Sequence, residues 1–128
     1  MVAIHDGVRP LVSSETIERC FGGAEDKGNA IPVVEVVDSL RHYSKQDKTN
    51  EAVSRSCYRT VQTPQCFTSE LILRAYEQEF DELFTDDATV VESLGERINL
   101  VEGNRSNIKI TTSEDIIIAE AFMKQHSI

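Results

Sequence analysis

Apolar and polar residues alternate in short blocks that predict strands and helices in turn. Residues 2–4 are apolar and predict a buried strand. A helix is then expected from a serine cap at position 13 or 14 to Gly28, because apolar residues recur there at helical spacing. That stripe consists of Ile17, Cys20, Phe21 and Ala24. Residues 29–34 predict an inner strand, in which Pro32 requires an end, an edge or a bulge. The order strand, helix, strand indicates an α/β fold.

The middle of the chain breaks this order. Residues 36–43 and 53–61 have strand-like patterns, and the wholly polar residues 44–50 between them suit the loop of a long hairpin. A hairpin with so few apolar residues cannot stabilise itself, because isolated two-stranded ribbons are marginal in water. We therefore expect residues 36–61 to form an arm that a partner chain grips.

Two helices are expected next. Thr68 or Ser69 can cap a helix with a broad apolar face, because both are good N-cap residues. The apolar positions of that face are Leu71, Ile72, Ala75, Tyr76 and Phe80. Thr85 can cap a second, short helix, since two aspartates follow it and favour the positive end of the helix dipole. Gly95 would end that helix.

The last third of the chain predicts two strands and a helix. Residues 97–101 and 107–110 read as strands separated by a turn-rich loop. Thr111 and Glu114 match a capping box, which predicts the start of a helix that continues to the C-terminus. Its apolar positions are Ile116, Ile117, Ala119, Ala121 and Met123.

Length and charge restrict the function. With 128 residues the chain is one modest domain, and a strand that begins at residue 2 with no element before it indicates the second half of a larger one. A formal charge of −9 argues against a nucleic-acid partner, although a few arginines and lysines can still bind a small anion. No apolar run is long enough to span a membrane and no secretory leader is present, so we expect a cytoplasmic protein.

The cysteines and histidines give no metal centre. Cys20, Cys57 and Cys66 are odd in number and lack C-x-x-C spacing, which excludes a disulfide framework and a zinc site and leaves buried or half-buried thiols. His5 directly precedes Asp6, and we expect it to orient the loop rather than to act in catalysis.

Four polar motifs each fall near the end of a predicted strand. They are residues 5–10 (His-Asp-Gly-Val-Arg-Pro), 62–65 (Gln-Thr-Pro-Gln), 85–88 (Thr-Asp-Asp-Ala) and 107–111 (Asn-Ile-Lys-Ile-Thr). In an open α/β sheet the strand ends form the ligand crevice, so these motifs outline one polar site. Taken together they predict an enzyme with a phosphate-containing substrate, although the chain has no Gly-rich phosphate loop.

Each motif residue also has an ordinary structural interpretation. Asp6 could bind a ligand or Mg²⁺, or it could accept loop N–H groups and pair with Arg9. Lys109 lies between two isoleucines and, by strand alternation, faces away from both, which also suits a solvated sheet face. Thr85 suits a helix cap first and an anion site second.

Taken in order, these segments resemble the 2-C-methyl-D-erythritol 4-phosphate cytidylyltransferases of the non-mevalonate isoprenoid pathway. The matching segments are residues 4–10, 31–33, 38–39, 61–67, 84–88, 101–103 and 107–111. The resemblance covers essentially the whole chain. It implies a Rossmann-like nucleotidyltransferase fold and a homodimer whose β-arm reaches into the neighbouring subunit's site. It also implies a reaction in which the substrate's phosphate oxygen attacks the α-phosphorus of CTP, with Mg²⁺ present, and releases pyrophosphate.

The resemblance also implies which residues hold the substrate phosphate. By position, Arg55 on the arm and Lys109 would hold it for in-line attack, as the catalytic pair. Arginine suits this role because its planar fork can bind two phosphate oxygens, while lysine supplies a point charge. Thr85 would add a hydroxyl to the phosphate, and Ser39 stands where the family commonly has threonine.

The remaining implied residues would hold the polyol and the metal. Asp6 would bind the polyol hydroxyls or lie beside Mg²⁺ and the nucleotide phosphates, with Arg9 next to it. Thr63 would shape the substrate loop.

The chain departs from the family at one point. The family begins with a Gly-rich loop whose arginines and lysines cradle CTP, and nothing in this chain matches it. We therefore expect residues 1–128 to be the C-terminal part of a cytidylyltransferase domain, inactive alone. A ribitol 5-phosphate cytidylyltransferase shares several motifs, but the residues around Thr85, together with Val61, favour the erythritol enzyme. A non-catalytic dimerisation module is the alternative from another class.

Overall fold

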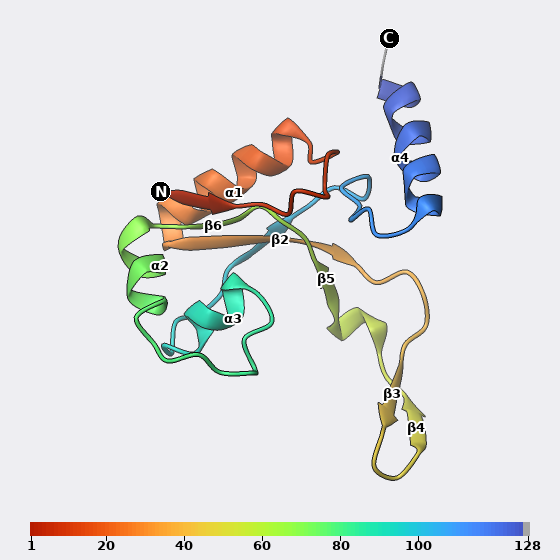
Figure 1. Ribbon diagram of the computed structural model, residues 1–128, viewed down its shortest axis with the longest axis horizontal. Coiled ribbons are helices and arrows are strands. Elements are labelled where there is room, and N and C mark those ends of the chain that lie inside the picture. The colour runs from red at the N-terminus through yellow and green to blue at the C-terminus, as the bar shows by residue number, and fades with distance from the viewer. Residues whose placement is uncertain (127–128) are drawn as a thin grey trace.

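A computed structural model describes residues 1–126 of the chain and shows an α/β body with an arm projecting from it (Figure 1). The body has one mixed sheet, with helices packed against it. The strands of this sheet are β1 (Val2–Ile4), β2 (Asn29–Glu35), β5 (Arg59–Val61), β6 (Gln65–Phe67) and β7 (Leu100–Glu102). The α/β class predicted from the sequence is confirmed.

Strand β2 is the centre of the sheet. Strand β6 lies between β1 and β2 and runs antiparallel to both, so β1 and β2 run in the same direction. Towards its C-terminal end, β2 pairs antiparallel with β5 on the edge where β6 pairs with its first residues. On its opposite edge β2 pairs parallel with β7. Pro32 lies where the partner changes from β6 to β5, and there its carbonyl accepts the Gln62 N–H at 2.8 Å. Pro32 was expected at a strand end, an edge or a bulge, whereas it lies inside β2 with partners on both sides, at the change of partner from β6 to β5.

Helix α1 (Ser14–Lys27) has the predicted caps and a narrower buried stripe than predicted. The Ser13 hydroxyl accepts the Thr16 N–H, and Gly28 ends the helix with a left-handed φ of 92°. Thr16, Cys20 and Ala24 form the buried stripe, whereas Phe21 is 39% exposed. Small side chains line this contact and allow the helix to approach the sheet closely, which leaves the bulky Phe21 beside the stripe.

The cysteines are partly as predicted. Cys20 on α1 and Cys66 on β6 are fully buried against each other, whereas Cys57 is exposed. The contact with Cys66, together with burial, raises the pKa of the Cys20 thiol.

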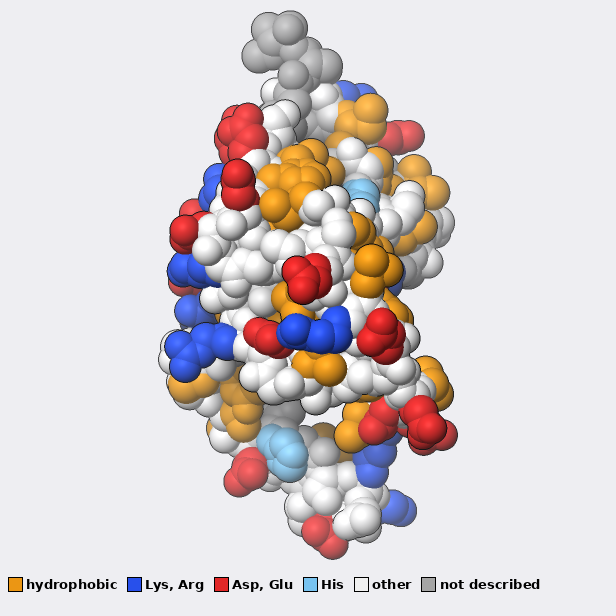
Figure 2. All heavy atoms as spheres, turned by 90° about the vertical axis from the view of Figure 1, so that its left-hand side faces the viewer, with side chains coloured by type: hydrophobic (Ala, Val, Ile, Leu, Met, Phe, Trp, Pro, Cys, Tyr) orange, Lys and Arg blue, Asp and Glu red, His pale blue; other side chains and the backbone are white. Residues whose placement is uncertain are grey.

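Helices α2 (Ser69–Ala75) and α3 (Asp87–Glu92) cover the other part of the core. Leu71, Ile72 and Ala75 are buried as predicted, but Tyr76 and Phe80 are 55% and 82% exposed. The helix ends at Ala75, so the residues beyond it leave the periodic face. Seen from this side, the surface shows hydrophobic side chains in small groups among charged ones (Figure 2).

The arm contains shorter strands than predicted. Within the described residues, strands β3 (Arg41–Ser44) and β4 (Thr49–Ala52) pair only with each other, and a 3₁₀ turn, η1 (Arg55–Cys57), follows them. The predicted strand 53–61 is therefore wrong in its first part, and its last part, β5, returns to pair with β2. Most residues of the hairpin are exposed, and it lies below the body in the views of Figures 1 and 2.

The C-terminal segment differs from prediction in two ways. Residues 107–110 do not form a strand, and the Ile110 N–H instead donates to the Val8 carbonyl at 2.9 Å. Helix α4 (Ser113–His126) begins with a box of Thr112 and Asp115, in which each side chain accepts the other's backbone N–H. The predicted box of Thr111 and Glu114 is thus wrong by one position. Helix α4 extends away from the body (Figure 1), and its three isoleucines are about half exposed or more, whereas Ala119 is buried.

Candidate active site

One pocket of about 350 Å³ gathers residues from all four predicted motifs. Five of the predicted site residues line it. These are Asp6, Arg9, Thr63, Thr85 and Lys109. The pocket lies beside the ends of β1 and β5, the start of α3 and the extended residues 107–110. Segments that are up to about 100 residues apart in the sequence thus meet at one site, as the strand-end argument predicts.

Arg9 holds three segments of this pocket together. Its Nε donates to the Asp6 carboxylate at 2.9 Å, and Nη1 donates to the Asn107 carbonyl at 2.8 Å. Nη2 lies 3.4 Å from the Val61 carbonyl oxygen, and the Arg9 side chain is only 12% exposed. The predicted ion pair between Asp6 and Arg9 is therefore present. Because most of the guanidinium donors are engaged, Arg9 shapes the pocket rather than offering a free fork to a ligand.

Two buried amides connect the loop after β5 to the segment that carries Lys109. Gln62 Nε2 donates to the Asn104 carbonyl at 2.9 Å, and Asn107 Nδ2 donates to the Thr63 carbonyl at 2.8 Å. Asn107 Nδ2 also reaches Gln62 Oε1 at 3.2 Å. Since buried amides of this kind are costly to leave unpaired, the network fixes both loops relative to each other.

Gly103 gives Gln62 the room it needs. A Cβ at this position would lie 2.3 Å from Gln62 Oε1 and 3.3 Å from the Val33 carbonyl. Gly103→Ala should therefore lower the free energy of unfolding by roughly 1–3 kcal/mol, measured by urea denaturation. Gly22→Ala is the matched control, because a Cβ there meets nothing within 4 Å and lies inside α1. The control should be neutral or stabilising, and equal losses in the two variants would contradict the role of the amide network.

Lys109 is the free cation of the site. It is exposed, while Ile108 and Ile110 on either side are half-buried, so the predicted alternation holds although the segment is not a strand. Within residues 1–126, Lys109 makes no hydrogen bond or ion pair. Its ammonium group is available to an anion in the pocket.

Asp86, not Thr85, caps α3. The Asp86 carboxylate accepts the Thr89 N–H at 2.9 Å, and the Thr89 hydroxyl accepts the Asp86 N–H at 3.2 Å. The predicted cap at Thr85 is therefore wrong, because this reciprocal box places the cap one residue later. Buried Gln65 holds the cap, since its Nε2 donates to Asp86 at 3.1 Å. The Thr85 side chain, released from capping, remains at the pocket wall.

Tyr76 donates its hydroxyl hydrogen to the Asp87 carboxylate. Partial burial of its ring, followed by this bond and the charges of Asp87 and Asp86, raises the pKa of Tyr76 from 10.0 to about 12. The unfolded chain therefore releases the phenol proton first, so the free energy of unfolding should fall as the pH rises from 10.0 to about 12. Tyr76→Phe should remove this fall in urea denaturation, and Tyr58→Phe is the matched control that should keep it. A fall that persists in Tyr76→Phe would assign the effect to another group.

Arg55 and Ser39 lie outside the pocket. Arg55 is on η1 at the base of the arm, and its Nη1 donates to the Val37 carbonyl. Ser39 is exposed between β2 and β3. Within one chain the structure therefore does not bring Arg55 together with Lys109.

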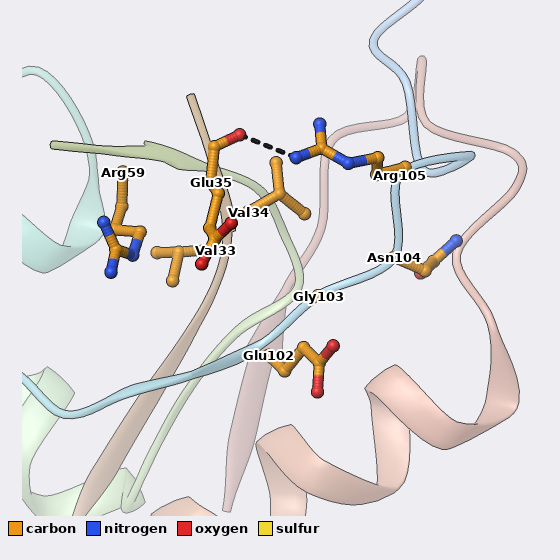
Figure 3. A pocket seen from close by; sticks show the side chains of 8 residues that line it. All are labelled: Val33, Val34, Glu35, Arg59, Glu102, Gly103, Asn104 and Arg105. Carbon is orange, nitrogen blue, oxygen red and sulfur yellow. Dashed lines mark hydrogen bonds between the residues drawn. The ribbon is translucent and has the colours of Figure 1, made fainter. Parts of the chain in front are cut away.

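A larger cavity of about 630 Å³ lies at the other end of β5. Figure 3 shows Arg59 and Arg105 facing it from opposite sides, with Glu35 and Glu102 between them. Arg105 donates to the Glu35 carbonyl at 3.0 Å. Arg59 donates to the carbonyls of Ser56 and Tyr58. Both guanidinium groups are thus engaged with backbone carbonyls. None of the four polar motifs lines this cavity. Lys109, whose ammonium group has no partner within residues 1–126, makes the smaller pocket the better candidate for an anionic ligand.

Sequence reasoning missed the amides that build the site. Gln62, Gln65 and Asn107 belong to the motifs, but the hydrogen bonds that bury them depend on contacts across the sheet. Asn104 lies in the turn-rich loop between residues 101 and 107, yet its side chain reaches the Ser13 N–H and the Leu11 carbonyl. The available signal was the amide residues within two of the motifs, at 62–65 and 107–111.

Two further findings concern metals and membranes. Among residues 1–126, no group of three carboxylate, imidazole or thiol side chains could by itself hold a metal ion. In the same part of the chain, every helix is too short or too polar to cross a bilayer.

Comparisons with known proteins agree on one family. Residues 1–125 match the family of 2-C-methyl-D-erythritol 4-phosphate cytidylyltransferases, IspD. A protein of that name from Bacteroides fragilis is 54% identical over 123 residues, which are 96% of this chain and 55% of the relative. Its counterpart in Bacteroides thetaiotaomicron is 53% identical with the same coverage. The chain spans about half the length of these curated relatives.

Solved structures give the same assignment. The crystal structure of 2-C-methyl-D-erythritol 4-phosphate cytidylyltransferase from Thermus thermophilus matches with a TM-score of 0.82 and 35% identity, covering 96% of this chain and 61% of that one. The 4-diphosphocytidyl-2C-methyl-D-erythritol synthase of Anaerococcus prevotii matches with a TM-score of 0.84 and 34% identity, covering 96% and 58%. The fold is therefore the nucleotidyltransferase fold expected from the resemblance. The chain belongs to the 2-C-methyl-D-erythritol 4-phosphate cytidylyltransferase family.

Proposed function

We propose that the protein carrying this chain transfers CMP from CTP to 2-C-methyl-D-erythritol 4-phosphate in the cytoplasm. The observation that carries the proposal is the pocket in which Asp6, Thr63, Thr85 and Lys109 converge around a space of about 350 Å³. A polyol phosphate has two chemical parts, and the pocket offers partners for both: carboxylate and hydroxyl oxygens for the polyol, and a free ammonium group for the phosphate.

The charges of the pocket indicate that a further cation takes part. Asp6, Asp86 and Asp87 line it against Arg9 and Lys109, so three carboxylates face two cationic groups. A phosphate monoester adds about −1.5 to −2 charges near neutral pH. Arg55 of a second copy is one source of positive charge, because it lies on an arm that its own body does not cover.

Mg²⁺ is the other source. Asp6 uses one carboxylate oxygen for Arg9, which leaves the second oxygen as a ligand at the pocket. One or two protein carboxylates together with phosphate oxygens are the usual ligands of Mg²⁺ in such sites. The donor set therefore fits, and a bound Mg²⁺ would neutralise charge on the nucleotide phosphates.

The chemistry requires positioning rather than a covalent intermediate. A phosphate oxygen of the polyol phosphate forms a new bond to the α-phosphorus of CTP, and the bond from that phosphorus to the bridging oxygen breaks and releases pyrophosphate. Lys109, Arg55 and the Thr85 hydroxyl would hold the attacking phosphate in line, while Asp6 orients the polyol. The contribution of this chain is thus to orient the acceptor substrate.

Pyrophosphate release tests the proposal. A chimera in which this chain replaces the matching 55% of the Bacteroides fragilis relative supplies the rest of that relative's length. We expect release that requires both CTP and 2-C-methyl-D-erythritol 4-phosphate, and a much lower rate with ribitol 5-phosphate. The 128-residue chain alone should release none. Preference for ribitol 5-phosphate would favour the related enzyme, and a folded but inactive chimera would favour a non-catalytic module.

The arm should make the protein a dimer. Its hairpin has mostly exposed residues, including Tyr43 at 58%, and a two-stranded ribbon of this kind gains stability when a second copy covers it. Light scattering should give twice the chain mass of 14.4 kDa over a range of concentrations. Deletion of residues 41–52, which contain β3 and β4, should give a monomer. A wild-type monomer would contradict the proposed arm contact.

A further inference from the structure

His5 connects two residues of the pocket wall. Its Nε2 lies 2.8 Å from the Arg9 carbonyl oxygen, and its Nδ1 lies 2.8 Å from the Thr63 hydroxyl oxygen. A carbonyl oxygen can only accept, so the N–H of the neutral ring must be on Nε2 and donate to Arg9. Nδ1 is then unprotonated and accepts the hydrogen of the Thr63 hydroxyl.

The Thr63 hydroxyl can consequently accept a hydrogen bond from a ligand in the pocket but cannot donate one. A hydroxyl group has one hydrogen and two lone pairs. The hydrogen goes to His5, and one lone pair accepts the Asp6 N–H at 3.0 Å. Thr63 lines the pocket, so a ligand can use only the remaining lone pair.

We propose that His5 is a positioning residue that fixes the hydroxyl hydrogen of Thr63, so that Thr63 selects a hydroxyl group of the acceptor substrate and not its phosphate. A phosphate oxygen carries lone pairs and negative charge, so it makes no hydrogen bond to a hydroxyl oxygen that can only accept. A polyol hydroxyl, in contrast, can donate its hydrogen to Thr63. The proposal rests on the proposed function for the identity of this ligand. It divides the pocket into a phosphate side at Lys109 and a polyol side at Thr63.

Nitrogen NMR of the histidine rings in the 128-residue chain tests the hydrogen bond without any ligand. The His5 signals, assigned by their loss in His5→Gln, should show an unprotonated Nδ1 and a protonated Nε2. Thr63→Val removes the hydroxyl donor, so it should move the Nδ1 signal much more than the Nε2 signal. The opposite tautomer, two protonated nitrogens, or an Nδ1 signal unmoved in Thr63→Val would overturn the proposal.

A matched pair of His5 variants tests the selection. The amide oxygen of His5→Asn lies near the position of Nδ1 and keeps the acceptor for Thr63, whereas the amide nitrogen of His5→Gln lies near Nε2 and keeps only the donor to Arg9. Each chain is titrated with 2-C-methyl-D-erythritol 4-phosphate and with analogues that each lack one hydroxyl. The wild type and His5→Asn should bind one analogue roughly tenfold more weakly, as for one lost hydrogen bond. His5→Gln and Thr63→Val should bind that analogue and the complete compound about equally.

The outcomes separate this proposal from the proposed function. If the wild type discriminates among the analogues and both His5 variants discriminate equally well, His5 does not act through Thr63. A wild-type chain that binds none of the polyol phosphates would contradict both the proposed function and the selection by Thr63. The nitrogen signals would still decide whether His5 fixes the hydroxyl hydrogen.

Discussion

Lys109→Ala and Arg55→Ala should each lower kcat/KM of the chimera for the polyol phosphate by roughly 30- to 900-fold. This corresponds to roughly 2–4 kcal/mol of transition-state stabilisation, as expected when one charge-assisted phosphate contact is lost. Lys109 has this effect because it is the free cation of the pocket, within the part of the chain that the structure describes. Pyrophosphate release measured over a range of both substrates gives the two constants.

Two exposed residues away from the pocket provide matched controls. Lys27 lies in the last turn of α1, and Arg97 precedes β7. Lys27→Ala and Arg97→Ala remove the same charges from the surface and should leave kcat/KM unchanged. If Lys109→Ala lost no more activity than Lys27→Ala, the phosphate would not bind at this pocket.

Mixing the two inactive variants should restore about a quarter of the wild-type activity. If Arg55 of one copy serves Lys109 of the other, a mixed dimer of Arg55→Ala and Lys109→Ala has one site with both mutations and one with neither. Random exchange makes half of the dimers mixed, and each mixed dimer has one intact site of two, which gives about a quarter. The expectation follows from the position of Arg55 at the base of an arm, outside its own chain's pocket.

Subunit exchange is confirmed separately, by mass spectrometry of copies with different tags. With exchange complete and no recovery of activity, Arg55 and Lys109 could not act in one site shared between copies. Arg55 would then be a solvated residue of the arm that holds the Val37 carbonyl.

Local sequence signals predicted correctly those helix ends that depend only on neighbouring residues. The serine cap and Gly28 bound α1 correctly because both act within one helical turn. Strand β6 was missed, since only three residues form it and their extended state depends on pairing with β1 and β2. Residues 107–110 were predicted to be a strand and are not one, because no strand within residues 1–126 pairs with their alternating pattern.

The site was predictable to a similar extent. Motif order and strand-end position brought Asp6, Thr63 and Lys109 to one pocket. The buried amides that hold these residues in place were not foreseen, since Gln62 and Asn104 meet only after the sheet has formed. The local sequence could not distinguish Thr85 from Asp86 as the cap of α3. Asp86 is the cap because Thr89 and Gln65 form hydrogen bonds with it.

A crystal structure of the chimera with bound 2-C-methyl-D-erythritol 4-phosphate tests the central claim most directly. The account predicts the phosphate beside Lys109 and Thr85, and the polyol beside Asp6 and Thr63, within the pocket of about 350 Å³. It further predicts that Arg55 reaching this phosphate comes from the other copy. Binding of the compound in the cavity between Arg59 and Arg105, with the smaller pocket left empty, would contradict the account.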